Sequence, residues 1–174
     1  APWVKTSLAP GSQVVMDYLE QSGLLRDLET LGFTIAAFGC TTCIGNSGPL
    51  HPAMEKTQQE NDLLLASVLS GNRNFSGRIH KNVTASFLMS PPLVVAYALA
   101  GRIDIDIVHD PIGLDASGEP IHLHDIWPDP EEIAALVQTH VTTESYRKKY
   151  SSIFSGDERW AQLPAPQKET FEWD

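Results

Sequence analysis

Two cysteines separated by two residues are the first feature of this sequence that could do chemistry. Cys40 and Cys43 are the only cysteines in the 174 residues, so a framework of several disulfides is excluded. Thiolates at this spacing occur in dithiol redox sites, zinc sites and iron–sulfur loops. The segment IGNSGP that follows breaks helices, which disfavours a redox dithiol at a helix start, and only His51 lies near enough in sequence to complete a zinc site. A loop holding two small buried residues is the alternative without chemistry.

A pair of arginines is the second candidate. Arg73 and Arg78 lie five positions apart. Gly71 before them and Gly77 between them would let the backbone bend close to a ligand. A guanidinium presents a planar fork that matches a carboxylate, so this pattern predicts recognition of an acidic substrate. Solvated arginines on a surface loop would have the same spacing.

Several histidines are further candidates for metal ligands or acid–base groups. His122 and His124 would share one face of a strand, but a strand facing solvent explains them without a metal. His109 and Asp110 are neighbours, and neighbours on a strand point to opposite faces, so no acid–base pair is predicted there. No catalytic residue is assigned from the sequence.

Short apolar runs precede both candidate loops. Residues 33–38 and residues 63–69 are predicted to be buried strands, the first followed by the cysteines and the second by the arginines. Ligands bind beyond the carboxyl ends of strands in an open α/β sheet, so we expect the two loops to converge on one site.

The rest of the sequence predicts both helices and strands. Helices are predicted over residues 24–30 and 91–99, and after the capping residues Ser12, Asp129 and Thr142 or Thr143. Alternating residues 104–108 and 121–126 flank a turn at 115–118 and predict a β-hairpin. The fold class is therefore α/β: a three-layer α/β/α domain with a mostly parallel sheet and a hairpin.

The composition disfavours two classes of protein, those that bind nucleic acid unspecifically and those that span a membrane. Twelve Lys and Arg against 22 Asp and Glu give a net charge of −10, which disfavours unspecific binding to nucleic acid. No apolar run reaches the roughly 18 residues of a membrane span. Without a signal peptide and with free cysteines, the chain is expected to be cytoplasmic. We also expect it to start within a longer protein and to be an excised domain.

The string GCTTCIGNSGPL around the cysteines resembles the cluster-binding segment of the aconitase family, in the branch with aconitase A and iron regulatory protein 1. The other matching segments are WVKTSLAPGS, SGNRNF with the following GR, SPPLVVAYALAG and DIWP. Essentially the whole chain is covered by the resemblance.

The resemblance implies a [4Fe-4S] cluster held by three cysteines, of which Cys40 and Cys43 match two. It implies that Arg73 and Arg78 bind substrate carboxylates and that Asn72 lies beside the cluster. The third cysteine has no counterpart here, so the cluster is expected to be absent from the isolated chain.

The expected activity is that of an aconitate hydratase, a carbon–oxygen lyase that interconverts citrate and isocitrate through cis-aconitate. These 174 residues alone are expected to be inactive. Residues 1–155 would resemble the third aconitase domain, and residues 156–174 would begin a linker toward a swivelling domain. Two alternatives stay open: a 2-methylcitrate dehydratase of the same branch, and an iron regulatory protein whose cluster-free form binds RNA. A small zinc module is a third.

Overall fold

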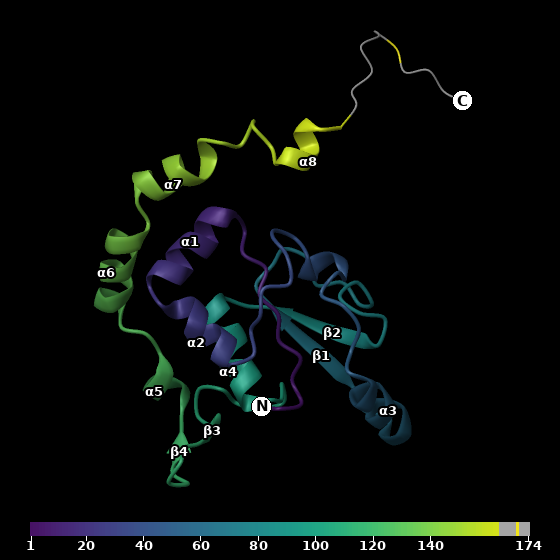
Figure 1. The fold of residues 1–174 in the computed structure, drawn as a ribbon. Helices are drawn as coiled ribbons and strands as arrows, with labels where there is room; N and C mark the ends of the chain where they lie inside the picture. The colour runs from purple at the N-terminus through teal and green to yellow at the C-terminus, as the bar shows by residue number, and fades with distance from the viewer. Residues whose placement is uncertain (164–169, 171–174) are drawn as a thin grey trace.

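The computed structural model describes residues 1–163 and residue 170 (Figure 1). Its elements in chain order are α1 (Gln13–Gln21), α2 (Leu24–Thr30), the 3-10 turn η1 (Thr42–Ile44), α3 (Pro52–Asn61), β1 (Leu65–Leu69), β2 (Val83–Leu88), α4 (Pro91–Ala100), β3 (Gly113–Leu114), β4 (Pro120–Ile121), α5 (Leu123–Ile126), α6 (Pro130–His140), α7 (Thr143–Tyr150) and α8 (Glu158–Ala161).

A parallel pair of strands lies at the centre of the first hundred residues. β1 and β2 pair in parallel, with Leu69 opposite Leu88, and α4 packs against β1. Across the pair, the Ser67 hydroxyl donates to the Ser86 hydroxyl at 2.8 Å. β3 and β4 form a separate antiparallel hairpin. The predicted α/β class, with its parallel sheet and hairpin, is confirmed.

Helix boundaries follow local chemistry. α4 begins with prolines at its first positions and ends where Gly101 adopts a φ of 74°, a left-handed conformation that glycine reaches without strain. The Asp129 side chain accepts from the Glu131 amide at the start of α6, and the Thr142 hydroxyl accepts from the Ser145 amide at the start of α7. These capping residues were predicted from the sequence, and the predictions are confirmed.

The predicted strand over residues 33–38 is wrong. The structure has there a single parallel bridge between Leu8 and Ile35, outside the sheet. The Leu8 amide donates to the Thr34 carbonyl, and the Leu8 carbonyl accepts from the Ala36 amide, both at 2.9 Å. The segment therefore pairs with the N-terminal residues, while β2, which was not predicted, takes the place beside β1.

The predicted strands over residues 104–108 and 121–126 are also wrong, because carboxylates bind the local backbone instead. Asp106 accepts from the Val108 amide at 3.2 Å, which makes a turn. The Asp125 carboxylate accepts from the His122 amide at 2.8 Å, so the chain enters the short helix α5 after two strand residues. A hairpin forms around the predicted turn, but its strands are β3 and β4, so the first strand lies at Gly113–Leu114 and not at residues 104–108. The Asp115 carboxylate closes its turn.

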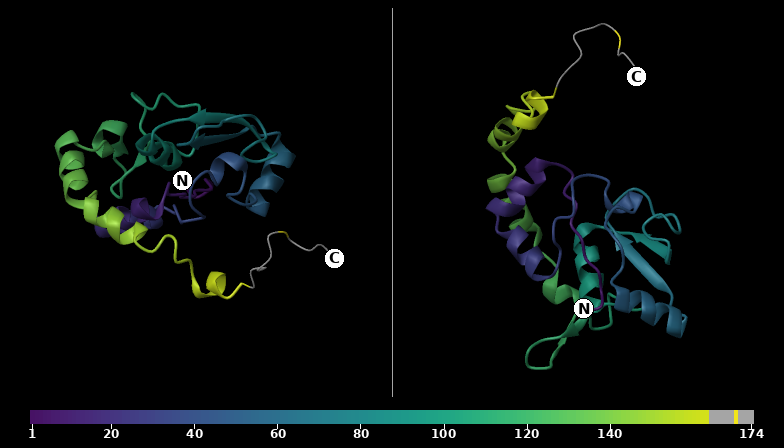
Figure 2. Two further views of the ribbon diagram at one scale, coloured as in Figure 1. Left: turned by 90° about the horizontal axis from the view of Figure 1, so that it is seen from above. Right: turned by 45° about the vertical axis from the view of Figure 1, so that its right-hand side comes forward.

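The segment from α5 to α7 runs along the outside of the first two helices. Figures 1 and 2 show α7 beside α1, and these helices contact each other. Residues 164–169 and 171–174, which belong to the predicted linker over 156–174, lie outside the described residues, and the described part of that range contains α8. Within the described part, no helix has the length and apolarity to cross a membrane.

Candidate functional site

The cysteine loop, residues 39–50, is folded around one tight turn. η1 holds Cys43, which is 5% exposed, whereas Cys40 just before it is exposed, and both thiols are free. Gly45 ends the turn with a φ of 78°, and the Asn46 amide donates to the Thr41 carbonyl at 3.0 Å. The glycine that breaks helices in the sequence thus reverses the chain directly after the second thiol.

The arginine loop, residues 70–78, packs directly onto the cysteine loop. A Cβ added at Gly71 would overlap the Cys43 Sγ, and one added at Gly45 would lie 2.8 Å from the Arg78 carbonyl oxygen. Only glycine allows such close approach at both contacts. Cys43 also forms one buried apolar cluster with Leu69 at the end of β1 and with Ile79. The predicted convergence of the two loops is therefore confirmed.

Arg78 links the two loops by a hydrogen bond. Its Nε donates to the Cys43 carbonyl at 2.6 Å. Among the described residues no carboxylate lies within 4.0 Å of this guanidinium, and its Nη groups have no hydrogen-bond partner. Arg78 is thus anchored by one nitrogen while the fork formed by the other two is left for a ligand.

Arg73 is less constrained. Its Nη1 donates to the carbonyl of the preceding residue, Asn72, at 3.1 Å, and the described residues place no carboxylate beside it. The neighbouring Asn74 attaches the loop to the sheet, because its side-chain amide donates to the Ser86 carbonyl at 3.1 Å. Two guanidiniums without acidic partners therefore lie on a loop that contacts a thiol. Asn74 was not singled out from the sequence, because its partner on β2 is 12 positions away.

A sequence model of the aconitase family, described as aconitate hydratase, matches residues 1–101, a range that includes both loops. The chain belongs to the aconitase family.

Relatives extend this likeness over the whole chain. Aconitate hydratase A of Thermus thermophilus is 58% identical over 173 residues, which are 99% of this chain and 19% of that protein. Aconitate hydratase A of Pseudomonas aeruginosa is 55% identical over 172 residues, again 99% of this chain and 19% of that protein. The Bacillus subtilis protein of the same name is 53% identical with the same coverage. The chain thus spans about a fifth of the length of these curated relatives.

The thiols fit an iron–sulfur site of the aconitase family in type but not in number. Thiolates are the ligands of such clusters. Cys40 and Cys43 are free, and the loop that carries them is held by the hydrogen bond from Arg78. The 174 residues contain no third cysteine. The described residues also bring together no group of three or more His, Cys, Asp or Glu that could hold a metal ion.

The histidines near the two loops have structural roles. His51 caps α3, its Nδ1 accepting from the Ala53 amide at 3.2 Å. The Nδ1 of His80 accepts from the Asn82 amide at 3.2 Å, and its Nε2 lies 4.0 Å from the Glu55 carboxylate. Each ring uses one nitrogen to satisfy a backbone donor, which accounts for both residues without chemistry.

His122 and His124 do not share a strand face. His122 caps α5 and His124 lies within it, with the two rings stacked at 5.5 Å. His109 pairs with Asp106, at 2.9 Å, rather than with its neighbour Asp110. No acid–base pair between His109 and Asp110 was predicted.

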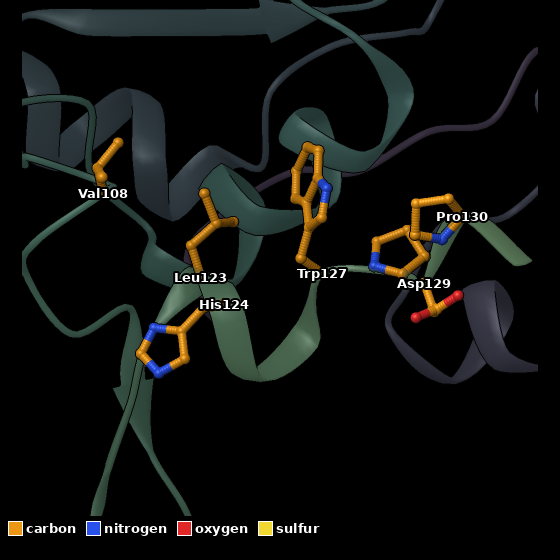
Figure 3. A pocket seen from close by; sticks show the side chains of 7 residues that line it. Val108, Leu123, His124, Trp127, Asp129 and Pro130 are labelled. Carbon is orange, nitrogen blue, oxygen red and sulfur yellow. The ribbon is translucent and has the colours of Figure 1, made fainter. Parts of the chain in front are cut away.

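A hollow of about 440 Å³ lies at α5, lined in part by Val108, Leu123, His124 and Trp127 (Figure 3). It shares no residue with the cysteine or arginine loop, and its walls are mostly apolar.

Proposed function

We propose that this chain carries the cluster loop and part of the substrate site of an aconitate hydratase, which converts citrate to isocitrate through cis-aconitate. The observation that carries the proposal is the junction of the two loops, where Arg78 Nε donates to the Cys43 carbonyl at 2.6 Å. It joins a thiol suited to iron and a cation suited to carboxylates within one piece of structure. The relatives named aconitate hydratase A support the same activity.

Cys40 and Cys43 would supply two of the three thiolates of a [4Fe-4S] cluster, and the third would come from outside these 174 residues. When bound, such a cluster supplies a Lewis-acidic iron for the substrate hydroxyl and carboxylate. Asn72 would offer its side-chain amide to hydrogen bonds beside the cluster.

Arg73 and Arg78 would bind and orient the substrate carboxylates. A guanidinium forms two parallel hydrogen bonds to a carboxylate, and a tricarboxylate substrate needs several such fixed cations. Because Arg78 is held by its Nε, less conformational freedom is lost when its other nitrogens bind a ligand. The proton-transfer groups of the reaction would come from other parts of the enzyme.

We therefore propose that these 174 residues on their own do not run the reaction, since they provide two thiolates and no assigned acid or base. Their partners would be the remaining aconitase domains and the tricarboxylate substrate. The two free thiols are suited to a reducing compartment such as the cytoplasm.

The test uses the full-length gene product, reconstituted anaerobically with iron and sulfide. It is assayed for cis-aconitate absorbance with citrate, and in parallel for dehydration of 2-methylcitrate. The proposal expects cluster absorbance and a higher kcat/KM with citrate. A preference for 2-methylcitrate, or binding of an iron-responsive RNA hairpin by the cluster-free protein without hydratase activity after reconstitution, would contradict it.

A further inference from the structure

Lys5, in the extended segment before α1, binds the far end of the cysteine loop. Its Nζ donates to the Gly48 carbonyl at 2.6 Å and to the Pro49 carbonyl at 2.8 Å. These contacts cross more than forty positions of sequence. Hydrogen bonds from an ammonium are shorter and stronger than those between neutral groups, so both carbonyls are held firmly.

The same N-terminal segment also holds the near end of the loop. The Gly39 amide donates to the Pro10 carbonyl at 2.8 Å, one residue before Cys40. Upstream of that contact, Leu8 pairs with residues 34 and 36. Residues 5–10 thus close the cysteine loop at both ends, and Lys5 is the side chain that closes the second end.

The partners of Lys5 are neutral. In the described part of the chain no carboxylate lies within 4.0 Å of its Nζ. Desolvation lowers the pKa of Lys5, because loss of water disfavours the charged ammonium. Lys5 is an exposed residue, and its two hydrogen bonds join the N-terminal segment to a loop rich in glycine, asparagine and serine. Ordering such a loop costs conformational entropy, which these hydrogen bonds help to offset.

We propose that Lys5 is a positioning residue of the cysteine loop, which by binding the Gly48 and Pro49 carbonyls keeps Cys43 buried and the two thiols set for the cluster. Its consequence for the cluster rests on the proposed function, whereas its effect on the thiols does not. Among the described residues, only Lys5 donates a side-chain hydrogen bond to residues 46–50 of the cysteine loop.

The first test measures thiol exposure in the cluster-free full-length gene product. Iodoacetamide labelling is followed at Cys43 and Cys40 separately by peptide mass spectrometry. Lys5→Met keeps an unbranched side chain of similar length but removes the hydrogen-bond donor. We expect Cys43 to be labelled about tenfold faster in this variant, as for the loss of an ordinary charged hydrogen bond. Lys5→Arg, which can donate to both carbonyls, should restore labelling to within about twofold of the parent protein.

Lys56→Met is the matched control, because Lys56 is exposed and its ion pair, with Glu60, lies along α3. It should leave both labelling rates unchanged. An unchanged Cys43 rate in Lys5→Met, or an equal rise in the control, would overturn the proposal. If Lys5→Met does not fold, Lys5→Gln is used, for which a smaller rise at Cys43 supports the proposal and no rise overturns it.

The second test follows the cluster itself. In the reconstituted protein, we expect Lys5→Met to lose its iron–sulfur absorbance about tenfold faster in air than the parent, and Lys5→Arg to lose it at the parent rate. If the parent protein takes up no cluster, the proposed function fails, and the labelling result still decides the role of Lys5. If the parent takes up a cluster and Lys5→Met keeps it equally long, the positioning role fails alone.

Discussion

At the scale of residues, the site depends on two glycines as much as on the thiols. Gly71 and Gly45 allow the arginine loop to touch the cysteine loop, since a Cβ at either position would collide with the other loop. Neither glycine carries a functional group. Their contribution is the space into which the Cys43 thiol and the Arg78 backbone fit.

Replacing Gly71 with alanine should separate the loops. The added methyl group would overlap the Cys43 Sγ, and overpacking of this kind costs about 1 to 3 kcal/mol. We expect urea unfolding to show a loss of that size, together with faster alkylation of Cys43. Gly113→Ala is the control, because nothing lies within 4 Å of its new Cβ. Equal effects of the two substitutions would disprove the contact.

The two arginines should differ in a measurable way. Arg78→Gln and Arg73→Gln are both expected to lower kcat/KM for citrate about 10- to 100-fold, mainly through KM, because a charged hydrogen bond to substrate is lost. Only Arg78→Gln should also speed loss of the cluster, since Arg78 alone binds the Cys43 carbonyl. Arg102→Gln, whose arginine pairs with Asp104, should leave both quantities unchanged. Identical cluster lifetimes would refute the linking role.

The pair of Asp106 and His109 should show a distinctive titration. The hydrogen bond that the His109 ring donates to the Asp106 carboxylate raises the pKa of His109 above 6.5 and lowers the pKa of Asp106 below 3.8. The pair therefore stabilises the fold fully between these two values. Its contribution is lost as pH rises through the raised pKa of His109 or falls through the lowered pKa of Asp106.

Proton NMR of the His109 ring measures this shift directly. Asp106→Asn should move the pKa of His109 back toward 6.5, because the counterion is removed. The other five histidines serve as internal references, whose titration curves should not move with the substitution. A His109 curve that is the same in both proteins would exclude the pairing.

At the scale of elements, an ion pair with a buried carboxylate joins α7 to α1. Lys149 on α7 lies 3.1 Å from the carboxylate of Asp17 on α1, and Asp17 is 5% exposed. Gln21 donates to the other carboxylate oxygen at 2.8 Å. Breaking such a pair leaves a charge buried without its partner, which is far more costly than losing a surface pair.

Lys149→Met should therefore release α7 from α1. We expect faster amide hydrogen exchange across residues 143–150 and a loss of about 1 to 3 kcal/mol in unfolding free energy. Lys148→Met is the control. Lys148 is the neighbouring residue on α7, and its side chain is exposed and forms no ion pair in the described part of the chain. If both variants exchange at the same rate, the ion pair does not dock the helix.

At the scale of the whole molecule, the sheet is too small for the apolar surface around it. Parallel strands are normally covered on both faces, yet Phe87 and Leu88 on β2 are 39% and 44% exposed. Phe75 and Leu64 nearby in the chain are more exposed still. Exposed apolar side chains of this kind favour association.

We therefore expect these 174 residues, when expressed alone, to self-associate. Size-exclusion chromatography with light scattering should show species larger than 19.1 kDa at micromolar concentration, and the dye ANS should bind. Phe87→Ser with Leu88→Ser should reduce both signals, whereas Thr84→Ser on the same strand should not. A monodisperse monomer that does not bind ANS would contradict this expectation.

The sequence by itself determined the family and most helix limits. Cysteine spacing, glycine, proline and capping residues act over a few positions, so the cysteine loop, α2, α4 and the starts of α6 and α7 could be predicted from neighbours in the chain. The segments of resemblance indicated the aconitase family, which the match over residues 1–101 confirms.

Only the tertiary structure decided which segments pair and which side chains hold the loops. Residues 33–38 are apolar enough for a strand but bind Leu8, and β2 takes the place beside β1, because hydrogen-bond partners distant in sequence leave no local pattern. The same holds for Arg78 with Cys43 and for Lys5 with Gly48. The residue types were visible from the start, and their contacts depend on folding across about forty positions.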